Sequence, residues 1–574
     1  MFKSPFLPRF LFSKAKSFIT LISTSLSTFT YTQTIHTMSS APPADYGKEA
    51  VTDVRSSQDV EAGETTKTGS LQRDLKNRHM QMIAIGGAIG AGLFVGSGGA
   101  LQKGGPAALI IGYMIIGIML LCTCLALAEM AVLYPINGAF FTYICRFVDP
   151  SWGFSMGVQY ALAWLTVLPF ELIAASITIK FWRDDINMAV WVSVFLAALI
   201  IVQIFGVRGY GEVEFVLSII KICACVGFII LGIVINCGGA GDKGYIGAKY
   251  WHDPGAFTTF KGFCSVFVVA AFSFGGTEMV GLAAAESANP RKSIPMASKQ
   301  VFWRIAIFYI LNLFIVGLIL PANDPRLMGA SGANTKASPF VLAIQDAGIK
   351  VLPSIMNAVI TISVLSVANS CTFGSTRTIQ AMAERNMAPA FFKYIDSKGR
   401  PLYCVLLQIA FGLLAYIGAA PSGGEIFGWL LALTGLGFLF VWGSICLAHI
   451  RMRSGMRAQG FNMELIPYKT PFGVIGSYLG LGLNILALVA SFYTALYPAS
   501  GASPNAETFF SNYLAFFTVI LFYFGYKIFT RKWSMYIPAS EMDLATGAVM
   551  LDEPEIKEPV AWSKLPLRAL RNLF

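Results

Sequence analysis

Residues 83–99 read IAIGGAIGAGLFVGSGG, and residues 268–287 read VVAAFSFGGTEMVGLAAAES. Both stretches are apolar, yet each carries glycines at its centre, where every Gly disfavours a helix by roughly 1 kcal/mol relative to Ala. Glycines at such a place either unwind a membrane helix, exposing backbone N–H and C=O groups to a charged solute, or let two helices pack closely. The spacings Gly86–Gly90 and Gly92–Gly96 suit close packing as well. One such stretch alone leaves both interpretations open.

The rest of the chain predicts a membrane frame around these two stretches. Its 574 residues are 55% hydrophobic and only 13% charged, whereas a soluble globular chain carries roughly 25% charged residues. Apolar stretches of about 20 residues recur along most of the chain, and hydrocarbon forces each one to be a helix. We therefore predict an all-α polytopic membrane protein with about twelve transmembrane helices. The predicted spans are 81–100, 107–134, 154–179, 189–206, 213–236, 263–285, 302–321, 352–376, 402–419, 425–449, 473–497 and 508–529.

The glycine-rich stretches fall in the first and sixth of these spans, at the same place in two groups of five. Because paired interruptions of this kind mark the binding site of transporters built from repeats, we favour unwound helices over simple packing.

Composition argues against several other classes of protein. Most of the ten cysteines lie inside apolar stretches, and the chain has only four histidines, so a disulfide scaffold or a zinc site is poorly supported. The net charge of +11 is spread over the loops and forms no single basic patch, which argues against a nucleic-acid partner. We find no nucleophile with a base partner, no metal motif and no phosphate loop, so we expect no enzyme, no metal and no cofactor.

Basic residues between the spans predict the orientation, because positively charged loops stay cytoplasmic. With the amino terminus inside, the cytoplasmic loops contain Arg291, Lys292, Lys299, Arg304, Arg385, Lys393, Lys398, Arg400, Arg451, Arg453 and Arg457. The loops after the third, fifth and seventh spans also carry Lys or Arg, so the bias is incomplete. An even number of spans then leaves both termini cytoplasmic.

The predicted domains are an amino-terminal tail (1–75), a transmembrane domain (76–530) and a carboxy-terminal tail (531–574). Residues 1–37 are basic, rich in Ser and Thr and free of acids, as in an organellar transit peptide. Met38 alternatively opens an ordinary cytosolic tail, with residues 1–37 as an extension of the gene model, and we favour this alternative. The carboxy-terminal tail turns acidic and ends in a short basic stretch, and we expect it to be solvated.

Five segments occur in one order along the chain: RDLKNRHMQMIAIGGAIGAGLFVGSG, LAEMAVLYPINGAFFTYICRFVDPSWGF, FGVRGYGEVEFVLSIIKI, AAFSFGGTEMVGLAAAESANPRKSIP and AERNMAPAFFKYIDSKGRPL. Together they resemble the fungal amino-acid permeases of the amino acid–polyamine–organocation superfamily, and most closely the general amino-acid permease branch. The resemblance implies a five-plus-five inverted-repeat (LeuT-like) core with discontinuous helices 1 and 6, and two additional helices.

The resemblance also implies roles for the residues at the breaks. The substrate carboxylate would meet N–H groups around Ala91 and Gly92, the ammonium would meet carbonyls near Ala88 and Gly275, and Phe272 would be an aromatic gate. The full substrate-binding set is Ala88, Ile89, Gly90, Ala91, Gly92, Phe272, Ser273, Phe274, Gly275, Gly276, Thr277 and Thr434, the last for side-chain selection. Ala91 stands where close relatives often have Thr, so a side-chain contact is lost and the substrate range stays open.

Ionisable groups inside spans cost energy and need a reason. Glu278 follows the break of span 6, where burial favours its neutral form, so it is a candidate for proton coupling or ammonium binding. The alternative is a structural carboxylate bonded to another helix.

By resemblance, Lys221 holds its ammonium where sodium-coupled relatives hold a sodium ion, which favours proton coupling over sodium coupling. The alternative is that Lys221 snorkels to the membrane interface. Glu171 follows Pro169 in span 3 and is the third coupling candidate. We expect Glu129 and Glu286 to pair with basic loop residues.

These features predict a plasma-membrane secondary transporter that imports L-amino acids with protons and has broad specificity. The alternatives are an amino-acid sensor that keeps the transporter fold, or a permease or exchanger of narrower specificity. The predicted partners are L-amino acids, protons, the lipid bilayer and, at the tails, trafficking or ubiquitination machinery.

Overall fold

The computed structural model describes residue 82 and residues 88–241, 244–287, 289–329, 338–397, 399–419, 423–499 and 503–551. Within these ranges the chain forms helices and no strands. The two alternatives for residues 1–37, the start of span 1 and the end of the carboxy-terminal tail lie outside the described residues.

Long apolar segments form long helices, because a backbone in hydrocarbon must satisfy its own hydrogen bonds. The principal helices are η1 (Gly92–Gly96), α3 (Ser97–Gly104), α4 (Pro106–Leu133), α5 (Ala139–Phe147), α6 (Pro150–Ile179), α7 (Met188–Ile204), α8 (Gly206–Asn236), α9 (Phe260–Phe274), α10 (Met279–Leu282), η3 (Ala283–Glu286), α11 (Pro290–Trp303), η4 (Arg304–Leu311), α12 (Asn312–Ile319), α13 (Pro339–Asp346), α14 (Leu352–Glu384), α15 (Leu402–Gly412), η8 (Leu413–Ala419), α16 (Gly423–Ala458), α17 (Gly473–Leu496), α18 (Ala506–Asn512) and α19 (Leu514–Thr530).

These helices follow the predicted spans closely. In the described part of the chain, eight helical segments are long and apolar enough to cross a bilayer, and α18 with α19 form one further span bent by 67°. Two shorter apolar helices, Met188–Ile204 and Leu402–Gly418, coincide with the predicted fourth and ninth spans. The remaining predicted span, the first, contains η1 and α3. The short helices α5 and α13 lie between spans.

The seventh span begins earlier than predicted, because α11, η4 and α12 run on as one helix from Pro290 to Ile319. Arg304, which we assigned to a cytoplasmic loop, lies in η4 inside this helix and is fully buried. That assignment was wrong. The guanidinium compensates for its burial by donating to the hydroxyl of Thr277 and lying over the ring of Tyr309.

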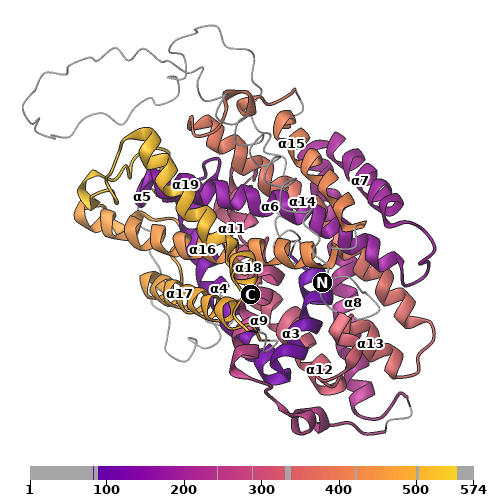
Figure 1. Cartoon of the computed structure of the whole chain (residues 1–574). Helices are drawn as coiled ribbons and strands as arrows, with labels where there is room; N and C mark the ends of the chain where they lie inside the picture. Colours follow the sequence, from indigo (N-terminus) through magenta and orange to yellow (C-terminus); the bar gives the residue numbers. More distant parts are fainter. Residues whose placement is uncertain are drawn as a thin grey trace, which may run out of the picture. The chain divides into compact units, whose positions relative to one another are not determined.

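Helices α6 and α14, the third and eighth spans, lie side by side and pack along one another (Figure 1). The two interrupted spans pack together where η1 and α3 meet α9.

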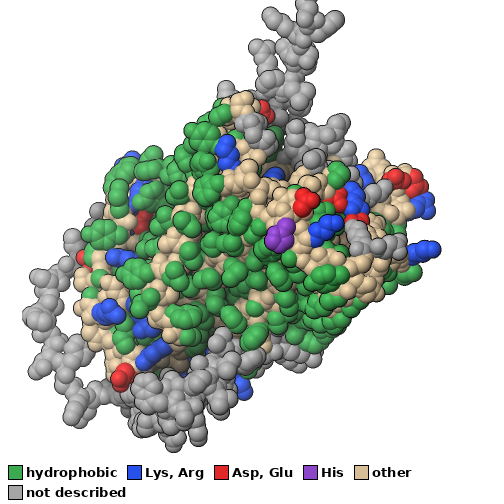
Figure 2. Space-filling model, turned by 90° about the horizontal axis from the view of Figure 1, so that it is seen from below, with side chains coloured by type: hydrophobic (Ala, Val, Ile, Leu, Met, Phe, Trp, Pro, Cys, Tyr) green, Lys and Arg blue, Asp and Glu red, His purple; other side chains and the backbone are tan. Residues whose placement is uncertain are grey.

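On the exposed side, α7, α8, α17 and α19 carry large hydrophobic side chains such as Ile201, Ile230, Val489 and Leu521. Figure 2 shows one face of the molecule as a broad hydrophobic area with few charges inside it, as expected of a surface that contacts lipid.

The carboxy-terminal segment 537–551 packs against the ends of helices. The hydroxyl of Tyr134 donates to the Leu544 carbonyl at 2.9 Å, and the N–H of Val549 donates to the Leu133 carbonyl at 2.9 Å. Leu544 is 1% exposed. Our expectation of a solvated tail is therefore wrong for this part, since its backbone groups and apolar side chains find partners on the transmembrane domain.

Candidate functional site

Residues 88–90 lie in the predicted break of span 1. Ala88, Ile89 and Gly90 are non-helical, and a helix begins at Ala91 and continues through η1 and α3 to Gly104. The first turn of a helix leaves N–H groups without partners inside the helix and carries the positive end of its dipole. A helix therefore starts at Ala91, where the resemblance places the substrate carboxylate; binding there stays a prediction.

The break of span 6 lies at residues 275–278. Helix α9 ends at Phe274, and α10 begins at Met279. Gly275 is extended, and Gly276 has a φ of 100°, a left-handed conformation that favours glycine. The carboxyl end of α9 carries the negative end of the helix dipole, so its last carbonyls favour a cation.

Glycines at the breaks also allow close packing. A Cβ on Gly92 would lie 2.5 Å from the Cα of Ser273, and one on Gly90 or Gly275 would collide with the side chain of Val367 or Phe438, respectively. The two interpretations of the glycines are therefore both correct. The helices unwind at 88–90 and 275–278, and they also approach neighbouring helices more closely than a side chain would permit.

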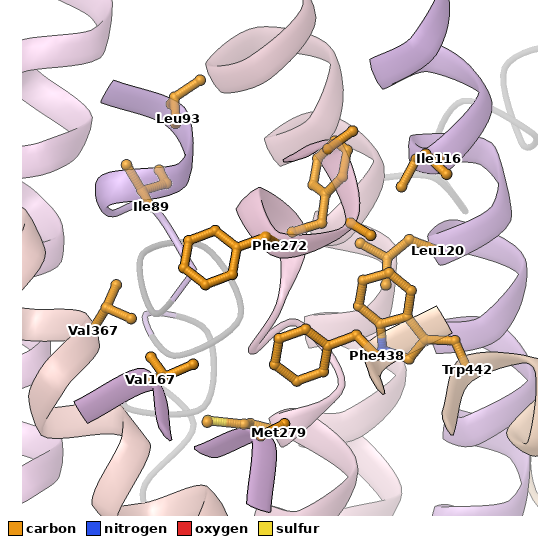
Figure 3. Packing of buried hydrophobic residues seen from close by; sticks show 14 of the residues in the cluster. Ile89, Leu93, Ile116, Leu120, Val167, Phe272, Met279, Val367, Phe438 and Trp442 are labelled. Atoms are coloured by element: carbon orange, nitrogen blue, oxygen red, sulfur yellow. The ribbon is translucent and has the colours of Figure 1, made fainter. Parts of the chain in front are cut away.

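Apolar side chains from four helices converge beside the break of span 1. In Figure 3, Phe272 on α9, Phe438 on α16, Val167 on α6 and Val367 on α14 point toward the same region near Ile89. The rings of Phe272 and Phe170 meet edge to face at 4.8 Å. Phe272 thus lies beside the break of span 1, and its role as a gate stays a prediction.

Thr434 lies next to the same region, although its hydroxyl is already engaged. Its Oγ1 donates to the Leu430 carbonyl at 2.7 Å and lies 3.3 Å from the Thr166 hydroxyl. The following residue, Gly435, approaches Phe272, since a Cβ on Gly435 would lie 3.5 Å from the Cβ of Phe272. Thr434 therefore joins spans 3 and 10 beside the predicted gate.

Three side chains of the predicted substrate set, on either side of the break of span 6, are bonded to or packed against other parts of the protein. The ring of Phe274 packs against Tyr113 and Tyr309 of spans 2 and 7 at centroid distances of 5.7 and 4.4 Å. The hydroxyl of Ser273 lies 2.8 Å from that of Tyr113. The hydroxyl of Thr277 donates to the Phe274 carbonyl at 2.7 Å. These residues can offer a ligand backbone groups, while their side chains hold the break in place.

Glu278 is fully buried and bonded to two other spans. Its carboxylate accepts from the Tyr160 hydroxyl at 3.0 Å, the Trp442 indole at 3.1 Å and the Gly276 N–H at 3.2 Å. An indole N–H and a backbone N–H can only donate, so this arrangement suits an ionised carboxylate. Arg304 interacts electrostatically with it and supplies positive charge.

Lys221 is fully buried and forms an ion pair with Glu214 at 3.5 Å. Snorkelling to the interface is therefore wrong for this lysine. Glu214 also accepts from the hydroxyls of Ser366 at 2.6 Å and Ser218 at 3.3 Å. Ser218 donates in addition to the Met82 carbonyl at 3.3 Å, so the pair stands beside span 1.

Glu171 reaches the break of span 1 from α6. Its Oε1 lies 3.7 Å from the position of a Cβ on Gly90, next to the start of the helix, where the Ala91 N–H interacts with it electrostatically. The side chain is 1% exposed, and Oε2 has no hydrogen-bond partner among the described residues. Lys221 interacts with it electrostatically. The structure thus brings Glu171 and Lys221 to the same break, whereas Glu278 lies at the other.

The remaining predicted acids pair inside the protein. Glu286 binds Arg377 of α14, and Glu129 meets His449 at 3.0 Å and Arg453 at 2.6 Å, both on α16. Arg453 is one of the basic residues that we assigned to a loop, so the expected kind of partner is found for Glu129, although α16 runs on to Ala458 and includes it. The expectation is wrong for Glu286, because Arg377 belongs to the helix of span 8.

Sequence reasoning missed two residues of the site. Glu214 lies seven residues, about two helical turns, before Lys221, and this spacing could have identified it as a partner on the same helix face. Tyr309 bonds to both breaks, but nothing in the pattern of span 7 distinguishes it from a core aromatic.

Comparisons with known proteins agree with this architecture. Residues 79–537 match the protein family described as amino acid permease. The general amino-acid permease GAP1 of Saccharomyces cerevisiae is 53% identical over 501 residues, which cover 86% of this chain and 83% of that protein. General amino-acid permease GAP2 of Candida albicans is 51% identical over 507 residues, covering 88% and 86%. Cationic amino acid transporter 1 of Schizosaccharomyces pombe is 50% identical over 516 residues, covering 88% and 86%.

A solved structure shares the fold at low identity. The crystal structure of the Eremococcus coleocola manganese transporter, in complex with an aromatic bis-isothiourea substituted compound, is similar with a TM-score of 0.51 and 13% identity. The similarity covers 79% of this chain and 94% of that chain. It concerns the fold alone, and it confirms the predicted five-plus-five inverted-repeat core.

Proposed function

Because the chain belongs to the amino acid permease family and is a multi-pass membrane protein that transports amino acids, we propose that it is a plasma-membrane importer of L-amino acids with broad specificity, driven by protons. The observation that carries the proposal is the pair of breaks, whose half-helix ends offer N–H groups at Ala91 and carbonyls at Ala88 and Ser273. Transport then proceeds by alternating access around spans 1 and 6.

Backbone groups at the breaks recognise what all amino acids share. A carboxylate binds the N–H groups at the start of the helix of span 1, and an ammonium binds the carbonyls of the breaks. Phe272 closes over the substrate, and Thr434 contributes to side-chain selection. The substrate set predicted from the sequence is retained as a whole in this proposal.

Proton coupling is supported by the buried charges. The Lys221 ammonium, paired with Glu214, is a built-in cation beside span 1 and takes the place of a sodium ion. A proton on Oε1 of Glu278 would turn the oxygen that accepts from the Tyr160 hydroxyl into a donor, while Oε2 would still face the Trp442 indole and the Gly276 N–H. Protonation would also remove the charge that strengthens these bonds, so it would weaken the hold on the break of span 6 and link proton binding to helix movement.

The experiment for coupling is uptake of labelled amino acids into proteoliposomes. We expect uptake to rise at acidic external pH and to collapse with a protonophore. Uptake that requires sodium would replace proton symport by sodium coupling, and uptake that persists unchanged without a gradient would remove proton symport and favour exchange. Binding without movement of solute would favour the sensor.

Breadth of specificity rests on the likeness to general permeases and needs its own test. A relative named as a cationic amino acid transporter is 50% identical to this chain, close to the 53% of the general permease GAP1. Overall identity therefore does not determine the substrate range. Competition of acidic, basic and neutral amino acids for uptake should reveal a broad profile, and inhibition by one class alone would assign a narrow permease.

We further propose that residues 1–75 and 531–574 are cytoplasmic tails, which trafficking or ubiquitination machinery can reach. Epitope tags at each end should stay inaccessible to antibody until cells are permeabilised. Labelling of intact cells at either end would reverse this orientation.

A further inference from the structure

The hydroxyl of Tyr309 joins the break of span 1 to the last turn of α9, directly before the break of span 6. It donates to the Ala88 carbonyl at 3.1 Å and to the Ser273 carbonyl at 2.9 Å, so one hydrogen is shared between two acceptors. These carbonyls belong to the set proposed to bind the substrate ammonium. Tyr309 is fully buried, and its ring is held against Phe274 and Tyr113.

We call the carbonyls of Ala88 and Ser273 the ammonium pole of the site, and the Ala91 N–H its carboxylate pole. A carboxylate of the protein lies at the carboxylate pole, as the Tyr309 hydroxyl lies at the ammonium pole. Oε1 of Glu171 lies 3.7 Å from the position of a Cβ on Gly90, beside the Ala91 N–H that is proposed to bind the substrate carboxylate, and it interacts with that N–H electrostatically. Its second oxygen, Oε2, is buried with no hydrogen-bond partner in the described ranges. A buried carboxylate with an unused oxygen at a helix start is held less completely than the carboxylate of Glu278, which accepts from three donors.

We propose that Tyr309 and Glu171 occupy the two poles of the empty amino-acid site as internal substitutes for the substrate, and that the substrate displaces both. This inference rests on the proposed function. It adds a reason why the site selects molecules that carry an ammonium and a carboxylate together.

An amino acid binds each pole better than the internal substitute does. An ammonium has three donors and a charge, so it can satisfy both carbonyls that share the single hydroxyl hydrogen, at the end of α9 where a cation is favoured. The displaced Glu171 keeps its electrostatic interaction with Lys221. The two carbonyls and the Ala91 N–H thus have partners with and without substrate, which avoids the cost of leaving these backbone groups unsatisfied.

Single-pole ligands provide the test. A primary amine that lacks the carboxylate can displace only Tyr309, and a carboxylic acid that lacks the amino group can displace only Glu171. Equilibrium binding of a neutral amino acid, its decarboxylated amine and its deaminated acid is measured on the full-length protein in nanodiscs, without any ion gradient. The variants are Tyr309→Phe and Glu171→Met, each of which removes one substitute and keeps the side chain's approximate size.

We expect Tyr309→Phe to tighten amine binding about tenfold and to leave acid binding unchanged, because the carbonyls lose their competitor. Glu171→Met should tighten acid binding about tenfold and leave amine binding unchanged. Tyr113→Phe is the matched control: it removes a hydroxyl from the same aromatic group that bonds to the Ser273 side chain, and it should change neither affinity. The two variants act at different poles, so each remains decisive if the other fails to fold.

Amino-acid binding by the wild type, with equal effects of each variant on amine and acid, would overturn this inference alone. Weaker amine binding by Tyr309→Phe would do the same, since it would make the hydroxyl a permanent part of the site. A wild-type protein that neither binds nor transports amino acids would overturn the proposed function and this inference with it.

Discussion

The breaks of spans 1 and 6 share a place in the repeat and a richness in glycine, yet they are held differently. At span 6, the Glu278 carboxylate is bonded to Tyr160 of span 3 and Trp442 of span 10, and Thr277 is bonded to Arg304 of span 7. This break is fixed by side chains from three other spans.

At span 1, the partners lie at backbone groups of the break, whereas at span 6 the partners are bonded to side chains. The Ala88 carbonyl accepts from Tyr309, and the carboxylate of Glu171 lies beside the start of the helix at Ala91, and we propose that a charged ligand replaces both. We call the break of span 6 the platform, because several side chains hold it while Glu278 is ionised, whereas few side-chain bonds hold the break of span 1. Four predictions test this contrast, beginning with the largest expected effect.

Lys221→Met should cause the largest loss, because it leaves Glu214 buried without its cation beside span 1. Removing one partner of a buried ion pair costs about 3 to 5 kcal/mol. We expect a lower melting temperature and little protein at the cell surface, measured by thermal unfolding in detergent and by surface labelling.

The double variant Lys221→Met with Glu214→Leu is the control, since it removes both charges. Replacing a whole buried pair with apolar residues is often neutral for stability. A double variant as unstable as the single one would mean that the pair does not act as a unit.

Glu278→Gln tests the platform at span 6. The carboxamide oxygen can take the place of Oε2 and accept from the Trp442 indole and the Gly276 N–H, but the carboxamide nitrogen then faces the Gly276 N–H at the place of Oε1 and the charge that strengthens these bonds is lost, at a cost of about 1 to 3 kcal/mol. We expect accumulation of amino acids to fall about tenfold or more, with surface delivery reduced less.

Glu507→Gln makes the same chemical change at an exposed position of α18 and should leave uptake unchanged. If Glu278→Gln accumulated amino acids as the wild type does, the carboxylate would be a packing group and the platform would not need its charge.

Gly92→Ala tests the close approach of the two broken spans. The new Cβ would lie 2.5 Å from the Cα of Ser273, so the helices must separate, and overpacking of this kind costs about 1 to 3 kcal/mol. Gly227→Ala in α8, where no atom lies within 4 Å, should be neutral or slightly stabilising. Uptake and melting temperature measure both variants. Equal behaviour of the two would show that the packing at Gly92 yields easily.

The fold was largely predictable from the sequence, because hydrocarbon imposes helices and the apolar stretches define their lengths. The spans came out close to the observed helices, and the glycines located both breaks. The error at Arg304 has a physical origin. Charge alone placed it in a loop, whereas the hydroxyl of Thr277 and the ring of Tyr309 solvate it inside the helix.

The site was less predictable, since its partners come from distant parts of the chain. Glu278 was recognised as important, but its donors Tyr160 and Trp442 lie 118 and 164 residues away. Tyr309 reads as one aromatic among many until the fold brings its hydroxyl to both breaks. The packing of the tail over Leu133 and Tyr134 was missed for the same reason.

Tyr160→Phe should have the smallest effect of the four variants. It is also the most direct comparison with Tyr309→Phe, because both variants remove a tyrosine hydroxyl, one at the platform and one at the ammonium pole. Glu278 would lose one of three donors and keep the Trp442 indole and the Gly276 N–H, so we expect a loss of about 1 to 2 kcal/mol in stability. Affinity for single-pole ligands should stay the same, since Tyr160 touches neither pole. Tyr309→Phe should instead change the affinity for amines. Binding and thermal unfolding of the two variants, measured side by side, separate a fixed platform from a displaceable partner. If Tyr160→Phe also tightened amine binding, the two breaks would respond as one, and the distinction between them would fail.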